Sequence, residues 1–469
     1  MSTPVARPLS VAIVGAGPSG FYAAEALLAS GREVRCDVFD RLPTPYGLVR
    51  GGVAPDHQNI KKVVALYEKI ARKSGFRFFG NVRLGRDLQT ADLFAAYDAV
   101  VYAVGNEDDR PLGIPGEELA GSHSATEFVF WYNGHPDYKH LRFDLNVENA
   151  VVVGIGNVAM DVARVLAQDP EDLAKTDMPR YAVDALRAAT KLKRIYVLGR
   201  RGPAQAAFTP KEIKELGELK HADLLFEPNE AALDPLSAAW LEQSKDPNAL
   251  KNMEYVREHA HDAAEGKPRR IHMRFLVSPT EFVGDPDGRL AQVRIERNVL
   301  QEDGKGGLRP RGTGTFELLD AGLAFRAVGY RGIPIPGVPF DARSGTVPNR
   351  EGRVLVEAGK QEAVPGAYVV GWAKRGPSGL IGTNKLDSAA TVKALLDDFP
   401  VGAAGPSASE QKQPEAIVRR LRERAVRYVT FEDWLRLDAE ELRRGAAAGK
   451  LREKFTDIAE MLAFLDRQG

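Results

Sequence analysis

Cysteine is almost absent from this sequence of 469 residues, in which Cys36 is the only one. A single thiol cannot form an internal disulfide, a redox-active CxxC pair or the cysteine ligands of an iron–sulfur cluster. If the protein carries out redox chemistry, a bound cofactor must therefore supply it.

Net charge is absent as well, because 64 lysine and arginine residues balance 64 aspartate and glutamate residues. This balance argues against attraction of the whole surface to nucleic acid or to a membrane, so any electrostatic steering must come from local patches. The first hydrophobic run, Val11 to Val14, and every later one are shorter than the roughly 20 residues of a membrane span. The start of the chain shows no signal-peptide pattern. We expect a cytoplasmic protein, and a mitochondrial matrix protein without its presequence would look the same.

The chain length suggests about three domains at roughly 150 residues each, with two or four also compatible. Two segments, 10–15 and 150–154, are β-branched runs that end in glycine and precede a helical pattern. The alternation of strands and helices after both predicts an α/β protein with two doubly wound parallel sheets. Further strands are expected at 34–39, 99–104, 194–198, 270–275, 290–298, 323–328 and 367–370. Helices are expected at 20–29, 60–73, 157–167, 181–192 and 386–396.

Three other segments stand apart by composition. Residues 209–265 are charged and helical in pattern, which indicates a solvated helical insertion, and the small polar residues of 401–414 indicate a linker. Beyond the linker, apolar residues share one face of an expected helix. Five arginines between 419 and 427 lie mostly on its other faces. That arginine run either faces solvent or closes down on the body of the protein.

The first glycine-rich motif is a G-x-G-x-x-G sequence formed by Gly15, Gly17 and Gly20. It follows an apolar strand and opens a helix, which is the context that a dinucleotide cradle requires. Gly15 allows the tight turn, Gly17 allows a pyrophosphate to approach, and Gly20 allows close packing of helix and strand. Asp40 ends the next strand, where a carboxylate binds a ribose 2′-hydroxyl and repels a 2′-phosphate. The motif therefore predicts the adenosine site of FAD or NAD.

The second motif, Gly154 to Ala159, reads G-x-G-x-x-A and again follows a strand. The next expected strand ends in Arg200 and Arg201 with no acid, and two guanidinium groups suit a 2′-phosphate. The alternative is a pair of solvated arginines. Residues 169–191 lengthen the usual spacing between the two strands and indicate an inserted or longer helix. Together the two motifs predict one resident and one exchanging dinucleotide, as in flavoproteins that use nicotinamide cofactors.

Longer motifs carry a resemblance to a known family. The sequence resembles the adrenodoxin reductase family, whose bacterial members are NADPH–ferredoxin reductases, and the resemblance covers nearly the whole chain. It rests on the segments 43–57, 154–161, 199–203, 371–385, 430–434 and 449–455. It implies two Rossmann-like domains, an FAD-binding domain of residues 1–106 and 330–469 and an inserted NADP-binding domain of residues 107–329.

The resemblance also implies the site residues. Positions that contact FAD correspond to Ala16, Asp40, Leu48, Val82, Trp372, Gly379, Leu380 and Ile381, beside Gly15, Gly17 and Gly20 of the cradle. The NADPH site corresponds to Gly154, Ile155, Gly156, Asn157, Arg200, Arg201, Glu212 and Gly379. Because Gly379 to Thr383 precede an expected helix, their free amides can face flavin oxygens.

Two residues are candidates for a catalytic role. His57 lies inside a signature motif and, in the family, near the flavin and nicotinamide, where it could orient a group or relay a proton. Glu212 could position the nicotinamide end of NADPH. The alternatives are a structural histidine and a solvated charge on the helix of 211–219. Asp161, at the start of the second cradle's helix, is a weaker candidate because a negative charge is favourable there anyway. No metal-binding motif is found.

The activity that the resemblance implies is hydride transfer from NADPH to FAD, followed by single-electron transfer to a ferredoxin. Since ferredoxins are acidic, we expect a basic docking patch on a monomeric protein with no nucleic acid partner. The candidate residues are Lys191, Lys193 and Arg194, the stretch 267–274, and Lys374 with Arg375. A flavin monooxygenase is the alternative enzyme, and a non-catalytic flavoprotein that senses NADPH is the alternative from another class.

Overall fold

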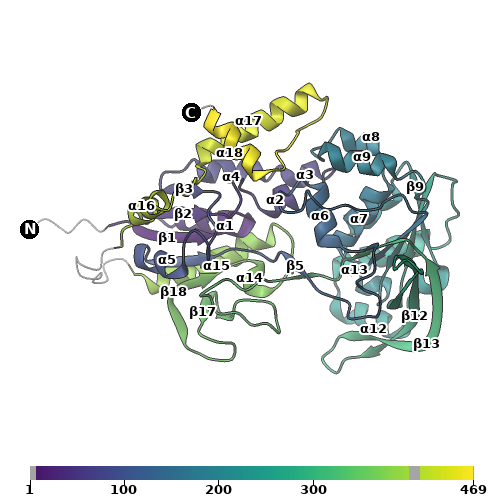
Figure 1. Ribbon diagram of the computed structural model, residues 1–469. Helices are drawn as coiled ribbons and strands as arrows, with labels where there is room; N and C mark the ends of the chain where they lie inside the picture. Colours follow the sequence, from purple (N-terminus) through teal and green to yellow (C-terminus); the bar gives the residue numbers. More distant parts are fainter. Residues whose placement is uncertain (1–6, 401–411, 468–469) are drawn as a thin grey trace, which may run out of the picture.

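The computed structural model describes residues 7–400 and 412–467, and the expected linker at 401–414 falls largely outside them. Two sheets lie side by side, a mostly parallel one built from both ends of the chain and a parallel one built from its middle (Figure 1). None of the described helices is long and apolar enough to cross a membrane. The two sheets confirm the predicted α/β class and its two Rossmann-like units.

The first sheet has seven strands in the order β16-β17-β18-β4-β1-β2-β3. The pairs from β18 to β3 are parallel, whereas β16, β17 and β18 form an antiparallel edge. The strands are β1 (Leu9–Val14), β2 (Val34–Phe39), β3 (Phe76–Phe79), β4 (Ala99–Tyr102), β16 (Asn349–Arg350), β17 (Arg353–Leu355) and β18 (Ala363–Val369). The central strand β1 is buried along its whole length, as expected for a parallel sheet that is covered on both faces.

Helices cover both faces of this sheet. One face packs on α1 (Pro18–Leu28), α4 (Val64–Ala71) and α15 (Thr383–Asp398), with α17 (Phe431–Ala447) and α18 (Ile458–Arg467) beyond them. The other face packs on α5 (Thr90–Ala96) and α16 (Glu415–Glu423). The arginine-rich helix α16 therefore closes down on the body, with Ile417 and Leu421 buried and Arg420 paired with Asp92.

The second sheet has six parallel strands in the order β6-β14-β7-β8-β10-β9. They are β6 (Ser122–Ser124), β7 (Asn149–Val153), β8 (Arg194–Leu198), β9 (Ala222–Phe226), β10 (Arg269–Arg274) and β14 (Leu323–Arg326). One face packs on helices that include α6 (Ala125–Tyr132), α7 (Asn157–Ala167), α9 (Arg180–Ala188) and α10 (Pro210–Gly217).

The other face of the second sheet is covered by an antiparallel sheet, formed by β11 (Val277–Gly284), β12 (Leu290–Glu302) and β13 (Leu308–Asp320). Alternate apolar residues of these strands, such as Val293 and Ile295, face the parallel strands. The remaining elements are α2 (Leu48–Gly51), α3 (Gln58–Lys61), α8 (Pro170–Ala174), η1 (Pro203–Gln205), α11 (Pro228–Ala231), α12 (Pro235–Ser244), α13 (Pro247–His259) and α14 (Trp372–Arg375).

The inserted unit is joined to the first by a narrow connection. The chain leaves through β5 (Asp108–Asp109) and returns through β15 (Tyr330–Arg331), and these two strands pair antiparallel. The two crossings of the chain therefore lie side by side.

Several details differ from the sequence-based expectations. The segment 209–265 is not purely helical, because it contains β9, which pairs with β10 at the edge of the second sheet. The helix expected at 60–73 is two helices, α3 and α4, separated by a turn. The extra residues of 169–191 form two short helices, α8 and α9, instead of one long helix.

Candidate active site

The first cradle is the turn between β1 and α1. Gly15 has φ +111°, and a Cβ there would overlap the carbonyl oxygen of Ala103 on the neighbouring strand connection. A Cβ on Gly20 would overlap the carbonyl of Gly15, so both positions require glycine for reasons internal to the fold. Gly17 differs, because the atom nearest to a Cβ added there is the Cα of Gly47, at 3.9 Å. The space in front of Gly17 and the N-terminus of α1 is thus free to take a pyrophosphate.

Asp40 lies at the end of β2 beside this turn. Its carboxylate accepts hydrogen bonds from the backbone amides of Ala16 at 2.8 Å and Leu42 at 2.9 Å. Burial raises its pKa to about 6 although both hydrogen bonds act in the opposite direction. The structure therefore fixes the predicted ribose-binding carboxylate against the cradle.

A segment from the far end of the sequence completes the first cradle. Ser19 on α1 is hydrogen-bonded through its hydroxyl to Asn384 at 3.1 Å and through its carbonyl to Ser388 at 3.0 Å, so α15 is joined to the cradle helix. Trp372 packs against Tyr330 with ring centroids 5.3 Å apart, and its buried Nε1 has no hydrogen-bond partner within the described residues.

The predicted flavin segment, residues 379–381, lies between α14 and α15. Gly379 has φ +80°, Leu380 is exposed, and Ile381 is partly buried just before α15 begins. Leu48 lies at the start of α2, while Val82 is buried and donates its amide to the carbonyl of Asp40. An unpartnered indole N–H and amides at a helix N-terminus fit the polar edge of a flavin.

The second cradle repeats the geometry of the first. Gly154 has φ +133°, and a Cβ there would overlap the carbonyl oxygen of Ala327, which follows β14. Gly156 has no neighbour within 4 Å of an added Cβ, so the N-terminus of α7 is open. Asn157 accepts a hydrogen bond from the amide of Thr209 at 2.9 Å, which fixes the loop opposite. Ile155 holds the same loop through its carbonyl, which accepts the amides of residues 207 and 208.

Arg200 and Arg201 follow β8 at the mouth of this cradle. Their backbone carbonyls accept hydrogen bonds from Asn298 and Leu276, so the turn is fixed. Among the described residues, neither guanidinium forms an ion pair with a carboxylate. Burial and the charge of Arg200 lower the pKa of Arg201, which indicates a pair of like charges without a counter-ion. A 2′-phosphate would supply that counter-ion.

A buried polar cluster lies between the two units. His57 comes from the first unit, is 7% exposed and contacts Glu215 through Nε2 at 2.7 Å. Glu212 on α10 is 5% exposed and lies 3.8 Å from the same ring nitrogen. Asp161 on α7 lies 3.6 Å from the other ring nitrogen. Glu212 is thus buried next to His57 and is not a solvated charge.

Arg164 holds this cluster together. Its guanidinium contacts Asp161 at 2.5 Å, Glu212 at 3.1 Å and Asp56 at 2.6 Å. Burial raises the pKa values of Asp161 and Glu212. Burial acts on Asp56 in the same direction, but Arg164 holds the pKa of that carboxyl below its usual value. The side chains of His57, Asp161 and Glu212 lie close enough together to hold a cation. Arg164 already provides a positive charge to the carboxylates of Asp161 and Glu212.

Comparison with known proteins shows the family. Residues 9–199 match the family model described as pyridine nucleotide-disulphide oxidoreductase. The chain is 42% identical to the NADPH-ferredoxin reductase FprA of Mycobacterium tuberculosis, over 97% of this chain and 99% of that one. It is 38% identical to the mitochondrial NADPH:adrenodoxin oxidoreductase of Arabidopsis thaliana, over 98% and 96% of the two chains. The chain belongs to the ferredoxin/adrenodoxin–NADP reductase family. The fold of this chain is similar to the solved structure of Mycobacterium tuberculosis FprA in complex with NADPH. The TM-score is 0.90, and the match covers 98% of this chain and 100% of that one.

Membership of the reductase family agrees with the two cradles. FAD and NADPH are the cofactors, and the residues fit them: one cradle carries a carboxylate and an unpartnered indole N–H, the other two uncompensated arginines. The disulphide chemistry in the description of the matched model has no counterpart in a chain with one cysteine, and Cys36 is buried.

Parts of the reductase site could not be found from the sequence. Arg164 gave no signal of its own beyond lying one helical turn after Asp161 on the same expected helix. Asp56 is adjacent to His57 in a signature motif, and that adjacency could have drawn attention to it. Glu215 lies three residues after Glu212 on α10 and therefore on the same helix face.

The structure places some of the predicted basic docking residues in ion pairs and leaves others exposed. Arg274 is buried and paired with Glu230 and Glu317, so it offers no free surface charge. Lys374 and Arg375 both lie within ion-pair distance of Asp387. The remaining basic candidates are exposed or partly exposed on the second unit, namely Lys191, Lys193, Arg194, Lys267, Arg269 and Arg270.

Proposed function

We propose that this chain is an FAD-dependent NADPH–ferredoxin oxidoreductase. The observation that carries the proposal is a buried polar cluster in which His57 of the first unit contacts Glu215 of the second, in a chain of the reductase family that has one glycine cradle in each unit. Bound FAD supplies the conversion of a two-electron donor into a source of single electrons. With one cysteine in the sequence, the chain has no dithiol through which the electrons could pass instead.

We assign His57 and Glu212 to the orientation of the reacting end of NADPH. The ring of His57 is held by Glu215 at Nε2 and by Asp161 and Arg164 at Nδ1. Arg164 fixes the carboxylates of Asp161 and Glu212, so their positions are set before NADPH arrives. Such preorganisation places the donor carbon close to its acceptor and keeps water out of the cluster. We assign Arg200 and Arg201 to the 2′-phosphate and Asp40 to the ribose of FAD.

The cofactor domains follow from the composition of the sheets. We propose that residues 1–106 and 330–469 bind FAD, because every strand of the seven-stranded sheet comes from these two ranges. We propose that residues 107–329 bind NADP, because they supply every strand of the six-stranded sheet.

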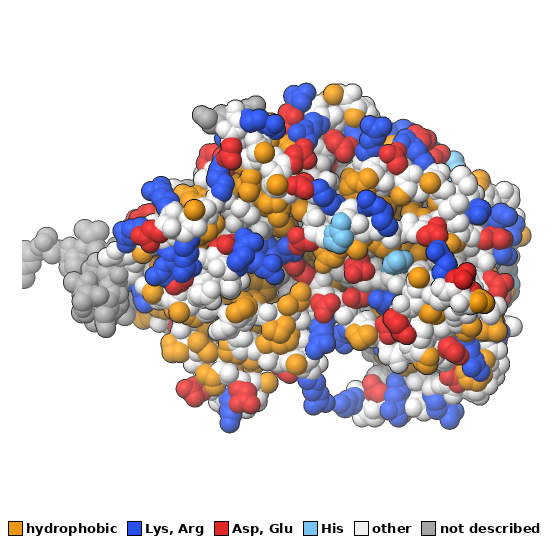
Figure 2. All heavy atoms as spheres, in the orientation of Figure 1, with side chains coloured by type: hydrophobic (Ala, Val, Ile, Leu, Met, Phe, Trp, Pro, Cys, Tyr) orange, Lys and Arg blue, Asp and Glu red, His pale blue; other side chains and the backbone are white. Residues whose placement is uncertain are grey.

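The acceptor is an iron–sulfur protein, and we propose an acidic ferredoxin that meets a monomer in the cytoplasm. Figure 2 shows lysine and arginine side chains interspersed with acidic ones over one face, so this face is not uniformly basic. Lys191, Lys193 and Arg270 are exposed cations of the predicted set. Attraction of this kind raises the association rate and weakens with salt.

An anaerobic titration of the purified protein tests the proposal. We expect a yellow protein whose flavin absorbance bleaches at stoichiometric NADPH and only weakly with NADH, followed by rapid reduction of added ferredoxin. A colourless protein, or one that NADPH leaves unchanged, would contradict it. Slow oxygen-dependent turnover of an organic substrate would favour a monooxygenase, and bleaching without onward transfer to any acceptor would favour a sensor.

A further inference from the structure

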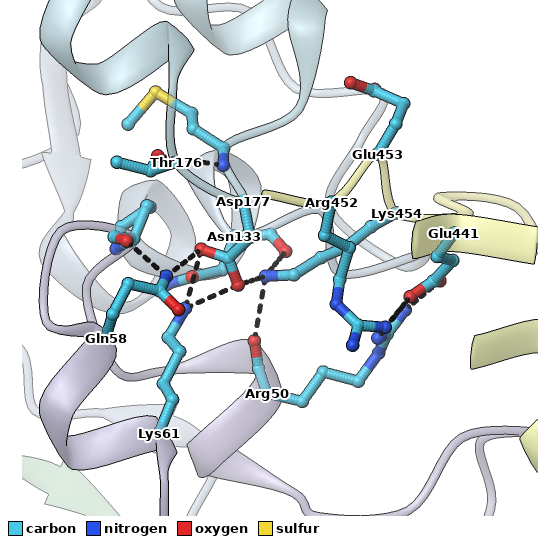
Figure 3. A network of polar contacts seen from close by, with 12 residues as sticks. Arg50, Gln58, Lys61, Asn133, Thr176, Asp177, Glu441, Arg452, Glu453 and Lys454 are labelled. Atoms are coloured by element: carbon cyan, nitrogen blue, oxygen red, sulfur yellow. Dashed lines mark hydrogen bonds and ion pairs between the residues drawn. The ribbon is translucent and has the colours of Figure 1, made fainter. Parts of the chain in front are cut away.

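Lys454 is buried where the two cofactor units and the C-terminal part of the chain meet. It belongs to the loop of residues 448–457 between α17 and α18, called here the C-terminal loop, and is 4% exposed. Its Nζ donates to the carbonyl oxygens of Arg50 and Asn133, both at 3.1 Å, and lies 2.9 Å from a carboxylate oxygen of Asp177 (Figure 3). Arg50 belongs to the first unit, whereas Asn133 and Asp177 belong to the inserted unit. One ammonium group thus joins both units.

This lysine is costly at such a place. Burial lowers its pKa to about 7, with Lys61 and Arg50 acting in the same direction and Asp177 opposing them. The three N–H donors of the ammonium have three acceptors, so the buried group is fully satisfied. A buried ion pair contributes little to stability when compared with a well-packed apolar side chain. The contacts of Lys454 therefore serve to fix the relative position of its three partners more than to stabilise the fold.

The residues around Lys454 also hold the segment 50–61 of the first unit. Lys61 and Gln58 of the first unit both donate to Asp177, at 2.7 Å and 3.2 Å. Arg50 also forms two hydrogen bonds to Glu441 on α17, at 2.8 Å and 2.5 Å. Glu441 is fully buried and also accepts hydrogen bonds from two residues of the C-terminal loop, Arg452 at 2.8 Å and the amide of Phe455 at 2.9 Å.

The supported segment, residues 50–61, carries His57. Asp56 and His57 lie in its middle and contact Arg164 and Glu215 of the inserted unit. The ends of the segment are held by Lys454 and Asp177. Any change in how the two units sit at the C-terminal loop must therefore move His57 relative to the cluster around Arg164.

Resting on the proposed function, we propose that Lys454 is a positioning residue for hydride transfer, which fixes the His57 segment and the inserted unit in one register. Its three polar partners are all protein groups. Its removal should leave each cradle intact and disturb the alignment between them, so the hydride-transfer rate should fall while both cofactors still bind.

The test compares Lys454→Met with Lys139→Met in the full-length holoenzyme. The control removes the ion pair between Lys139 and Asp457, which joins the same loop to the inserted unit but is about one third exposed at both ends and is worth little. At saturating NADPH we expect flavin bleaching in a single turnover to slow on the order of tenfold in Lys454→Met, with the NADPH Kd within about twofold. The control should match the wild type in both quantities.

A second readout does not depend on activity. Because Cys36 is buried, cysteines introduced at the exposed positions Lys69 and Lys191 can be spin-labelled selectively. The distance distribution between labels on the two units should broaden in Lys454→Met and stay narrow in Lys139→Met. If Lys454→Met does not fold, Asp177→Asn carries the same comparison, because it removes the shared carboxylate and leaves the lysine in place.

The outcomes separate the two proposals. Unchanged bleaching rates and unchanged distance distributions would overturn the role of Lys454. A tenfold rise in the NADPH Kd with an unchanged limiting rate would also overturn it, because it would place the effect in binding. If NADPH bleaches no flavin in the wild type, the proposed function fails, and the distance distributions still decide whether Lys454 fixes the register.

Discussion

The two glycine cradles share one backbone geometry but differ in what surrounds them. In both, a glycine with positive φ lies against a carbonyl that follows the neighbouring strand, Ala103 for Gly15 and Ala327 for Gly154. The first is closed by α15, which is hydrogen-bonded to Ser19 on the cradle helix. The second has an open mouth with two uncompensated arginines. The two cradles therefore differ in the elements and charges around them and not in the glycine motif itself.

The largest effects should come from the paired glycine variants Gly15→Ala and Gly154→Ala. Each forces an alanine to a positive φ and onto a carbonyl, at a cost of more than about 2 kcal/mol. We expect Gly15→Ala to lose bound FAD and most of its thermal stability. Gly154→Ala should keep its yellow colour and lose flavin reduction by NADPH. Flavin absorbance after gel filtration and thermal unfolding measure both, and equal flavin loss in the two variants would erase the distinction between the cradles.

The next effect concerns the charge at the second cradle. Replacing both Arg200 and Arg201 by Ala removes two charge-assisted contacts, each worth about 1.5–3 kcal/mol, so the NADPH Kd should rise on the order of a hundredfold or more. The Kd for NADH should change little. Lys193→Ala, at the opposite end of β8 and outside the cradle, is the matched control. An equal loss for NADPH and NADH would show that the arginines do not bind the 2′-phosphate.

A smaller, pH-dependent effect is expected at the first cradle. Burial raises the pKa of Asp40 to about 6, and its ionised form is the stronger acceptor for the ribose hydroxyl that we assign to it. The affinity of the apoprotein for FAD should therefore be constant above pH 7 and fall as the pH drops through 6. Fluorescence titration of the apoprotein from pH 5 to 8 measures this. In Asp40→Asn the affinity should be lower throughout and lose that dependence, and a wild-type profile that is flat to pH 5 would contradict the assignment.

The smallest effect is expected at Cys36, on the strand before Asp40. Burial raises the pKa of this thiol, so it stays protonated and unreactive. Cys36→Ala should cost about 1 kcal/mol of stability and leave ferredoxin reduction within error of the wild type. Loss of activity in a folded Cys36→Ala variant would show that electrons do not leave through the flavin alone.

Both cradles were predictable because their signals are local. A glycine that needs a positive φ, the strand before it and the helix after it all lie within one short stretch of sequence, and β2, β8 and α7 have the bounds that the pattern predicts. The positions of Asp40, Arg200 and Arg201 were predictable for the same reason, since each follows the strand after a cradle, whereas their binding roles stay a prediction.

The interior of the site was not predictable in the same way. Arg164 reads as an ordinary helical charge until the fold brings Asp56 to it across 108 residues of sequence. Lys454 reads as one of several charges in a polar loop, and its acceptors at Arg50 and Asn133 lie more than 300 residues away. β13 was not predicted, because its sequence has no alternating apolar pattern. Its residues are mostly exposed and include glycines and charged residues.

The paired connections β5 and β15 have a consequence for how the protein is made. β4 needs β18 as its neighbour, and β18 is synthesised only after the whole inserted unit. The inserted unit has all strands of its own sheet as soon as β14 has emerged, so on the ribosome it can fold first, while β1 to β4 wait with one edge unpaired. An open parallel edge of that kind attracts other chains. We therefore expect aggregation during synthesis to begin at the first-made strands, and destabilising the inserted unit to lengthen the time for which they stay exposed.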